Sequence, residues 1–405
     1  MQRHLPNHGA QTMANLPFIL PEILLNLDEF IELRRQIHAH PELGFEEKRT
    51  SELVAAKLAE WGYEVHAGVG RTGVVGTLRV GDGCRALGIR ADMDALPIQE
   101  NTGLPYASTC PGKMHACGHD GHTAILLAAA KYLAETRRFN GTLNLIFQPA
   151  EEGLGGAPAM LEDGLFERFP CDAVYALHNA PGLPVGCFAL KEGAMAASSD
   201  SVDIRLAGVG AHGAMPSFGR DPIVAASSIV MALQTLVARN IPATEAGVVS
   251  VGSLHAGKTY NVIPEHAELK LTVRALSRDV HATLKQRLHE VVQLQAQSFG
   301  VAAEIDYRTI SPVLVNTPDE TRFMSALIRE QTGAQCLIEP PQGMMGSEDF
   351  AWMLEKKPGC YVLLGNGTES RGGCMVHNPG YDFNDEALPV GASLWARLTE
   401  NYLRA

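Results

Sequence analysis

The chain has 405 residues and a formal net charge of −12, from 33 basic and 45 acidic side chains. This length exceeds what one hydrophobic core usually supports, so we expect two domains. The acidic balance, without any block of Lys or Arg, argues against nucleic acid or an anionic membrane as a partner. With 46% hydrophobic and 19% charged residues, the composition is that of an ordinary globular protein.

The eight cysteines are scattered without a CxxC pair, which favours a reducing compartment, the cytoplasm, over a disulfide framework. The apolar run Pro17–Leu25 is interrupted by Pro21 and Glu22, and no small-residue cleavage site follows it. We therefore interpret it as neither a signal peptide nor a membrane span. We expect residues 1–16 to be a loose leader, and Met13 is a candidate for the natural start.

The first half of the chain alternates helical and strand-like patterns, which predicts an α/β sheet. Continuous apolar runs mark strands that are covered on both faces. The expected helices cover 27–40, 46–61 and the segment from His122 to about Glu135, and the expected strands cover 63–66, 73–80, 86–91, 142–147 and 173–177.

From about residue 195 the pattern changes to strands with one polar face and two longer helices. The order βαββαβ is the split-βαβ pattern of a ferredoxin-like unit. Its elements are expected at 201–206, 223–237, 248–254, 267–273, 280–297 and 301–307, followed by 321–331, 361–364 and 390–403. This order predicts a first domain formed by 1–194 and 311–405, with 195–310 inserted as a second domain.

One short stretch, Met114–His122, holds a thiol, three imidazoles and a carboxyl group just before an apolar run. The simpler alternative is a glycine-containing turn before a buried helix, with surface histidines. Soft and borderline ligands rarely cluster without a metal, so we favour half of a metal site. Cys117 and His119 do not share a helical face and can converge only through a turn, which Gly118 permits. His122 is expected to support the site, and Asp120 to cap the helix or orient an imidazole.

Further candidate ligands follow apolar strands. Glu151 and Glu152 come directly after 142–147, at the end of a parallel strand where ligand sites gather, although a solvated acidic loop is the alternative. Consecutive side chains point in different directions, so one can bind a metal while its neighbour faces a substrate. His178 follows the next strand. Taken alone, neither His178 nor the later His377 is strong evidence for a metal site. Five ligands exceed the need of one four-coordinate metal and suit two metals that share a bridge: Cys117, His119, Glu152, His178 and His377.

Two positions in the expected inserted domain suggest substrate contacts. His212 lies in the glycine-rich stretch Gly208–Gly213, which is either a plain turn or a functional loop. Arg274 can hold a carboxylate through two parallel hydrogen bonds, the alternative being a satisfied salt bridge.

Several stretches together resemble the dinuclear-metal aminoacylase and carboxypeptidase superfamily, in the amidohydrolase branch that holds hippurate hydrolases and auxin-conjugate hydrolases. The similarity covers nearly the whole chain and is carried by Gly88–Pro97, Met114–His122, Gln148–Gly153, Ala176–Asn179, Gly210–Gly213 and Gly346–Phe350, with His377 in the expected terminal segment. It implies a zinc-peptidase-like catalytic domain with an inserted lid and dimerisation domain. It also implies Cys117, His119, Glu152, His178 and His377 as metal ligands.

The resemblance further implies roles for residues around the metals. Glu151 would be the catalytic base. His212 would bind the tetrahedral intermediate, in some relatives across a dimer. Asn261 and Arg274 would bind the substrate carboxylate. Where relatives place a ligating histidine two residues before an aspartate, this chain has Asp92-Met93-Asp94, so we expect Asp94 to orient rather than ligate and Cys117 to bridge the metals.

We therefore expect hydrolysis of an N-acyl or N-aroyl amino acid to a carboxylic acid and a free amino acid. The alternatives are a dipeptidase or metallo-carboxypeptidase, a hydrolase with Cys117 as nucleophile, and a non-catalytic binding protein. The expected cofactors are two divalent metal ions per chain, Zn²⁺ or Mn²⁺, with Co²⁺ or Ni²⁺ also suited to these ligands. The expected assembly is a homodimer or homotetramer, without nucleic acid or membrane as a partner.

Overall fold

The computed structural model describes residues 18–369 and 372–404, and the chain divides into two compact units. The first unit comprises the chain up to Glu192, Asn316–Pro340 and the chain from Met353, and the second comprises Gly193–Val315 and Pro341–Trp352. The expected leader and Met13 lie outside the described residues.

The segment Pro341–Trp352 was placed in the other domain by the sequence analysis. It belongs to the second unit because Met344 and Gly346 make backbone hydrogen bonds with Met195 and Ala197.

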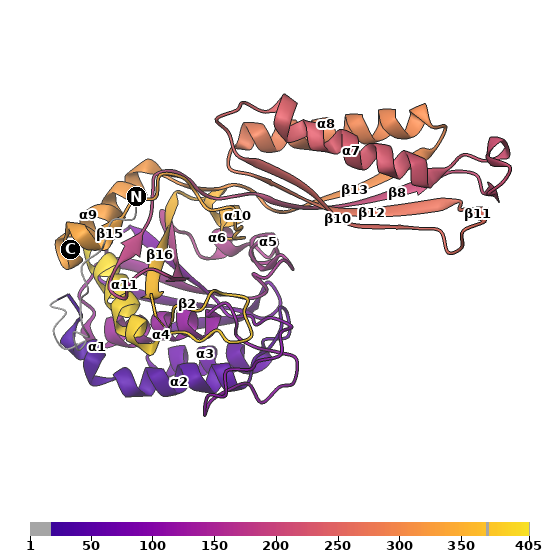
Figure 1. The fold of residues 1–405 in the computed structure, drawn as a ribbon. Coiled ribbons are helices and arrows are strands. Elements are labelled where there is room, and N and C mark those ends of the chain that lie inside the picture. The colour runs from indigo at the N-terminus through magenta and orange to yellow at the C-terminus, as the bar shows by residue number, and fades with distance from the viewer. Residues whose placement is uncertain (1–17, 370–371, 405) are drawn as a thin grey trace. The chain divides into compact units, whose positions relative to one another are not determined.

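The first unit is built on a mixed eight-stranded sheet with the order β1-β2-β4-β3-β5-β16-β6-β15 (Figure 1). Its central strands β4, β3, β5 and β16 run parallel, as expected for apolar strands that are buried on both faces. The strands are β1 (Glu64–Val69), β2 (Gly73–Val80), β3 (Ala86–Asp92), β4 (Gly141–Gln148), β5 (Ala173–Pro181), β6 (Phe188–Ala189), β15 (Leu337–Ile338) and β16 (Gly359–Gly367).

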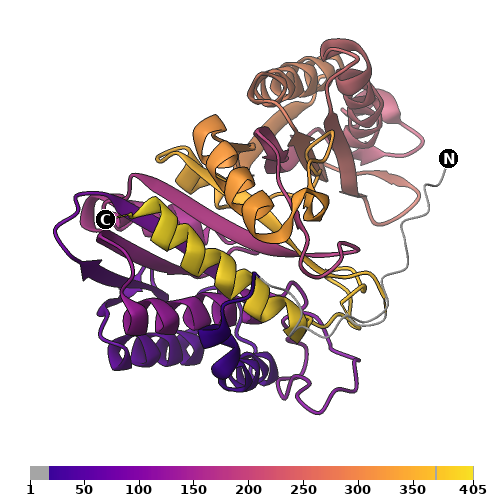
Figure 2. The same cartoon turned by 90° about the vertical axis from the view of Figure 1, so that its left-hand side faces the viewer.

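Helix α4 (His119–Thr136) is the central helix of this unit and is buried along most of its length. It packs on β3, β4 and β5 and is surrounded by α2, α3 and α11, an arrangement that Figure 2 shows from a second side. The other helices are α1 (Pro21–Leu25), α2 (Leu27–Ala39), α3 (Lys48–Glu60), α5 (Gly156–Glu162), α6 (Leu165–Arg168), α9 (Pro318–Thr332) and α11 (Leu388–Tyr402). α1, α5 and α6 were not predicted, because segments of one or two turns carry too little periodicity.

The parallel register of β3, β4 and β5 determines where the functional side chains gather. Asp92 at the end of β3 pairs with Gln148 at the end of β4, and Arg90 pairs with Ala176 in β5. The carboxyl ends of the three strands therefore meet at one edge of the sheet, the edge at which open α/β sheets bind ligands. β5 is longer than predicted, and His178 lies within this strand rather than after it.

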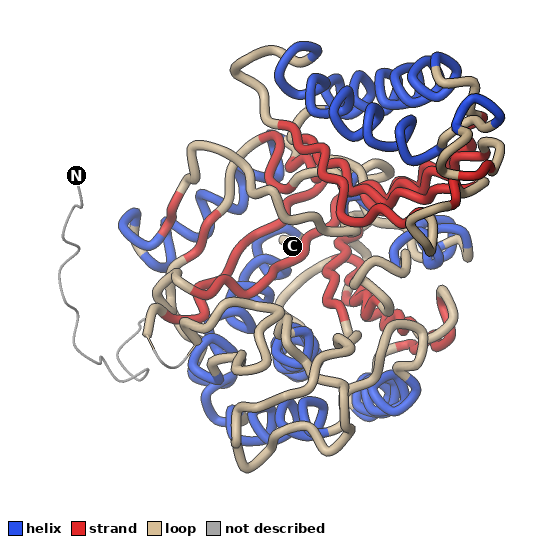
Figure 3. The backbone as a smooth tube through the Cα atoms, turned by 45° about the vertical axis from the view of Figure 1, so that its right-hand side comes forward, coloured by secondary structure: helices blue, strands red, loops and turns tan. Residues whose placement is uncertain are grey.

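The second unit has the predicted βαββαβ order and forms a four-stranded antiparallel sheet, β10-β12-β8-β13. Figure 3 shows α7 and α8 together on one face of this sheet. Burial alternates along β12, with Ala267, Leu269, Leu271, Val273 and Ala275 buried beneath the helices. Its elements are β8 (Ser199–Ala207), α7 (Pro222–Asn240), β10 (Gly247–Ala256), β12 (His266–Ala275), α8 (Arg278–Ser298) and β13 (Ala302–Ser311).

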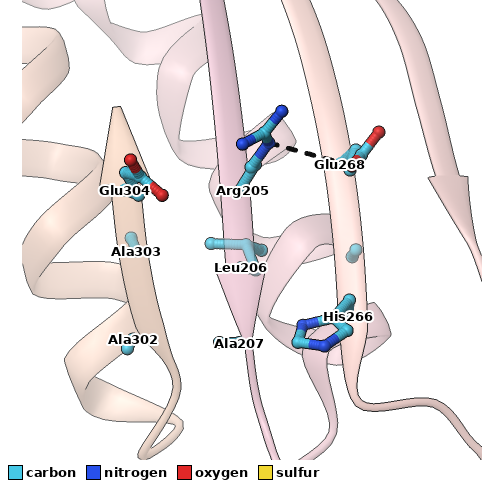
Figure 4. Close-up of a pocket in the computed structure, with 9 residues that line it drawn as sticks. Arg205, Leu206, Ala207, His266, Glu268, Ala302, Ala303 and Glu304 are labelled. Atoms are coloured by element: carbon cyan, nitrogen blue, oxygen red, sulfur yellow. Dashed lines mark ion pairs between the residues drawn. The ribbon is translucent and has the colours of Figure 1, made fainter. Parts of the chain in front are cut away.

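The other face of this sheet is polar. A hollow of about 350 Å³ lies across the ends of β8, β12 and β13, with the side chains shown in Figure 4. Its one marked ion pair joins Arg205 and Glu268 at 3.9 Å, and both side chains are more than half exposed. Exposed pairs of this kind contribute little free energy. We therefore regard the hollow as a solvated sheet surface and assign no site to it.

The remaining described elements are short. β9 (Ala211–His212) and β11 (Val262–Ile263) form a two-stranded ribbon, and β7 (Gly193–Ala196) pairs with β14 (Leu314–Asn316). α10 covers Ala351–Leu354.

A buried ionic cluster joins α2 to the first turn of α4. The Arg34 guanidinium is inaccessible to solvent and contacts Asp120 at 3.1 Å and Asp385 at 2.8 Å. The His38 ring, also inaccessible, bonds Asp120 at 2.9 Å and lies 3.4 Å from Glu100. Burial by itself would lower the pKa of His38, but the contact with Asp120 outweighs it and raises the pKa to about 9.

We predict that His38→Gln changes how stability depends on pH. Because the folded pKa lies above the ordinary value of about 6.5, protonated His38 stabilises the fold fully below that pH. This contribution disappears as the pH rises through about 9. Between pH 6 and pH 9.5 the wild-type unfolding free energy, measured with urea, should therefore fall more than that of the variant, by on the order of 3 kcal/mol. His40→Gln, at the exposed end of the same helix, should keep the wild-type slope. Equal slopes for wild type and His38→Gln would contradict the assignment.

Candidate metal centre

The turn before α4 brings two predicted ligands together. Gly118 has a φ of 91°, and a side chain there would lie 2.2 Å from Asn179 Oδ1 and 2.5 Å from the Tyr381 hydroxyl. Only glycine satisfies both constraints. The turn lets Cys117 and His119 approach from consecutive segments, and β5 adds His178. The ligand atoms of these three residues all lie within 4.8 Å of one another.

The five predicted ligands divide into two groups that share one thiol. Cys117, His119 and His178 form the first group, and the Cys117 sulfur lies 3.3 Å from His178 Nε2. Cys117, Glu152 and His377 form the second, and His377 Nε2 lies 3.3 Å from Glu152 Oε1. A thiolate common to both groups is the arrangement that a bridging ligand requires. The structure thus brings all five side chains to one place in the first unit.

The donor atoms fit divalent cations. Thiolate, imidazole and carboxylate are ligands for zinc and for other first-row metals. His119 Nε2 is buried, makes no hydrogen bond among the described residues and lies 3.8 Å from Asp92 Oδ2. A buried nitrogen without a hydrogen bond is costly unless a ligand occupies it. The His178 Nδ1–H donates to the carbonyl of Asn179 at 2.8 Å, which leaves Nε2 as the ligand atom.

The electrostatics of the site also fit metal binding. Burial raises the pKa of the Cys117 thiol well above its usual range, and the negative charge of Glu152 adds to this effect. A cation that binds here must therefore displace a proton from the thiol. Burial and the neighbouring His122 hold the pKa of His178 well below its ordinary range, which keeps this ring neutral and able to ligate.

Asp94 connects three parts of the site. Its carboxylate oxygens accept the backbone N–H groups of Glu151 and Glu152, each at 3.0 Å, and one oxygen lies 3.2 Å from His119 Nδ1. These contacts are what the predicted orienting role requires. Glu151 also belongs to a group with His119 and Glu152 whose ligand atoms lie within 4.8 Å of one another, so it lies directly beside the candidate ligands.

His122 forms a further group of possible ligands with Asp92 and His119, and both of its ring nitrogens also make contacts within the protein. Its Nδ1 lies 2.6 Å from Asp92 Oδ1, and its Nε2 accepts the backbone N–H of Asn179 at 3.0 Å. Both ring nitrogens are thus engaged, as the sequence analysis expected for a supporting histidine. Arg90 Nη1 lies 2.7 Å from Asp92 Oδ2. This ion pair fixes the end of β3 next to the ligands.

The sequence analysis did not predict three side chains that support the site: Arg90, Asn179 and Tyr381. Asn179 Nδ2 donates to the Tyr381 hydroxyl at 2.7 Å, a contact between residues 202 positions apart. Only the adjacency of Asn179 to His178 could have suggested its role.

Two further side chains of the motif, Asp120 and His115, do not belong to the candidate ligand groups. Asp120 does not cap α4, for which no side-chain capping hydrogen bond is present. It orients an imidazole, but that of His38 rather than that of a candidate ligand. His115 is buried without a hydrogen bond to any described residue, and burial lowers its pKa to about 4.

The second unit places two further candidates side by side. His212 pairs with Val262 between β9 and β11, and the Gly213 N–H donates to the Asn261 carbonyl at 2.8 Å. The Ala214 N–H donates to His212 Nδ1 at 3.1 Å. A nitrogen that accepts a hydrogen bond carries no proton, so in the neutral ring Nε2–H remains as an exposed donor.

Arg274 lies near the end of β12 and is half-buried. Its guanidinium makes no ion pair or hydrogen bond within 18–369 and 372–404, so the satisfied salt bridge considered from the sequence is not observed. Burial lowers the pKa of Arg274, although Asp200 opposes the change. A partly desolvated guanidinium without a partner is suited to binding an anionic ligand.

Comparisons with known proteins identify the family of the chain. Residues 88–401 match the family model described as peptidase family M20/M25/M40. The chain is 46% identical to a hippurate hydrolase of Campylobacter jejuni over 95% of this chain and 100% of that protein. It is 39% identical to IAA-amino acid hydrolase ILR1-like 2 of Arabidopsis thaliana, over 95% and 87% respectively.

A solved structure is similar over most of the chain. The Bacillus subtilis YXEP protein, described as a dinuclear metal binding peptidase from the M20 family, superposes with a TM-score of 0.80 at 33% identity. The match covers 94% of this chain and 99% of that one. The chain therefore belongs to peptidase family M20/M25/M40.

Proposed function

We propose that this protein hydrolyses the amide bond of N-acyl or N-aroyl amino acids, using two divalent metal ions. The observation that carries this proposal is the position of Glu151 beside two ligand groups that share Cys117. The names of the relatives support the substrate class, because a hippurate hydrolase acts on an N-aroyl amino acid. The products would be a carboxylic acid and a free amino acid.

Cys117, His119 and His178 would hold one ion, and Cys117, Glu152 and His377 the other. Bound ions would polarise the substrate carbonyl and lower the pKa of a water molecule toward ~7. Thiolate and imidazole favour Zn²⁺, whereas the carboxylate admits Mn²⁺, Co²⁺ or Ni²⁺.

Glu151 would act as the proton carrier. Its backbone N–H is held by Asp94, so the start of its side chain has a defined position next to the ligands. The carboxylate would take a proton from the attacking water and then give it to the leaving nitrogen. This transfer lets the amine depart as a neutral group.

The family resemblance assigns substrate-binding roles to His212, Asn261 and Arg274 of the second unit, in some relatives across a dimer. His212 would donate its Nε2–H to the oxyanion of the tetrahedral intermediate. The side-chain oxygen of Asn261 accepts the Thr259 hydroxyl at 3.2 Å, which leaves the amide N–H groups for a substrate carboxylate. Arg274 would pair with that same carboxylate.

A thiol mechanism is disfavoured by the site itself. A nucleophilic cysteine needs a lowered pKa, and burial instead raises the pKa of Cys117. A dipeptidase or metallo-carboxypeptidase would use the same residues, and nothing in the site favours it over an aminoacylase.

We predict that Glu151→Gln retains its metals but loses amide hydrolysis. The substitution removes the proton acceptor and no candidate ligand, so metal content by mass spectrometry should match the wild type while kcat for benzoyl-glycine falls by at least about 10³-fold. The wild type, loaded in turn with Zn²⁺ and Mn²⁺, is the reference. Turnover within tenfold of wild type would refute the role of Glu151. A wild-type enzyme that cleaves no N-acyl amino acid would refute the proposed function.

We predict that Arg274→Ala raises KM for free-acid substrates about 100-fold and much less for the same substrates as carboxamides. The guanidinium–carboxylate pair is worth about 2–3 kcal/mol, and a carboxamide cannot form it. Steady-state kinetics on benzoyl-glycine and benzoyl-glycinamide would measure the difference. Arg205→Ala, on the solvated face of the second unit, should change neither. An equal rise for both substrates would remove the carboxylate role.

We also infer that two or four copies of the chain assemble through α7 and β10. β10 is an edge strand without Lys, Arg, Asp or Glu, the residues that usually protect an exposed edge. α7 packs beside it and is apolar enough to span a membrane by length and composition. Its inner face is buried on the sheet, whereas Met231 is 71% exposed. A second copy would cover this apolar surface.

We predict that Met231→Glu converts the assembly to monomers at micromolar concentration. A charge at an apolar contact between copies would have to be desolvated without a partner. Light scattering coupled to gel filtration would measure the mass. Leu294→Glu on α8, a similarly exposed apolar position, should keep the wild-type mass. A monomeric wild type, or a Met231→Glu variant of unchanged mass, would contradict the inference.

A further inference from the structure

Glu47 carries a buried carboxyl group that the proposed mechanism does not use. This residue lies at the start of α3 and is inaccessible to solvent. A buried carboxyl group is costly unless hydrogen-bond donors surround it. The Thr72 hydroxyl donates to Glu47 Oε2 at 2.5 Å, and the Ala150 N–H donates to Glu47 Oε1 at 2.8 Å. The carboxyl group therefore joins the start of α3 to the turn between β1 and β2 and to the loop after β4.

Ala150, the residue that Glu47 holds in this loop, has a strained backbone. Its φ of 52° is a left-handed conformation that residues other than glycine seldom adopt. Such a conformation persists only where its surroundings hold it in place. Both polar groups of the Ala150 backbone are held, because Glu47 accepts its N–H and the Gly156 N–H donates to its carbonyl at 3.0 Å. The next residue along the chain is Glu151.

The segment that ends at Glu47 packs directly against the strained residue. A Cβ on Gly44 would lie 2.9 Å from the Cβ of Ala150, so a larger side chain at position 44 would displace this loop. The same segment also contacts the loop after β3, because the Ala95 N–H donates to the Glu42 carbonyl at 2.8 Å. Residues 42–47 are thus fixed against the loops that follow β3 and β4.

Two acidic side chains share the three consecutive backbone N–H groups at the end of β4. Glu47 accepts that of Ala150, and Asp94 accepts those of Glu151 and Glu152. We propose that Glu47 is a positioning residue, which fixes the backbone of Ala150 and thereby the direction in which the Glu151 side chain leaves the loop. This inference rests on the proposed function, in which Glu151 carries the proton. A small misplacement of such a group lowers the rate strongly, because proton transfer requires a defined geometry.

The test compares two substitutions of Glu47 by steady-state kinetics on benzoyl-glycine. Glu47→Ala removes the acceptor for the Ala150 N–H, so kcat should fall about 10²-fold while KM changes less than about threefold. Glu47→Gln keeps a carbonyl oxygen that can accept the same N–H, so its kcat should stay within about threefold of the wild-type value. The metal content of both variants should equal that of the wild type, because no candidate ligand changes. Glu46→Ala, which removes the exposed neighbouring carboxylate, should alter neither kcat nor KM.

Three results would overturn this inference while the wild type still hydrolyses benzoyl-glycine. The first is a Glu47→Ala variant with kcat within about threefold of wild type. The second is an equal loss in the Ala and Gln variants, because the loss would then come from the charge rather than from the hydrogen bond to Ala150. The third is a loss of kcat that matches a loss of bound metal, because Glu47 would then support the candidate ligand Glu152 instead of Glu151.

Two further arrangements keep the outcomes separate. Glu47→Leu fills a similar volume without an acceptor, so it takes the place of Glu47→Ala if that variant does not fold, with the same expected loss of kcat. If the wild type cleaves no N-acyl amino acid when loaded with Zn²⁺ or Mn²⁺, the proposed function is overturned and this inference with it.

Discussion

The carboxylate of Asp94 is the interaction on which the candidate site most depends. It accepts the backbone N–H groups of Glu151 and Glu152 and contacts His119, so it joins the end of β4 to the start of α4. Charge-assisted hydrogen bonds of this kind are stronger than neutral ones. Because Asp94 holds the backbone of Glu151 and Glu152, it fixes the positions from which their side chains start.

Around this centre, buried carboxylates are paired with basic side chains. Asp92 is paired with Arg90 and His122, and Asp120 with Arg34 and His38. Single buried charges are costly, but each of these carboxylates has a cationic or hydrogen-bonding partner. Asp92 contacts His122, and Asp120 is itself a residue of α4, so both clusters hold the first turn of this helix. The positions of the candidate ligands thus follow from ionic contacts as well as from apolar packing.

Much of the regular structure was predictable. The long helices and strands of both units were found close to their observed bounds, because their apolar periodicity extends over many residues. The βαββαβ order of the second unit is confirmed by its sheet order. The misses were short or depended on distant partners: α5 has seven residues, β6 and β15 two each, and Pro341–Trp352 joins the second unit through backbone bonds to 195–197. Such elements exist because a neighbour provides hydrogen bonds, which a local pattern does not record.

The sequence by itself determined which chemical groups are present, the clustering of Cys117 and His119 around Gly118, and the family to which the chain belongs. Only the tertiary structure decided how those groups are used. It divided the five candidate ligands into two groups that share Cys117, assigned Asp120 to His38 rather than to a candidate ligand, and left Arg274 without a hydrogen bond or ion pair among the described residues. The physical reason is that these roles depend on distances between strands far apart in the chain, which the parallel register of β3, β4 and β5 and the folding of the second unit set.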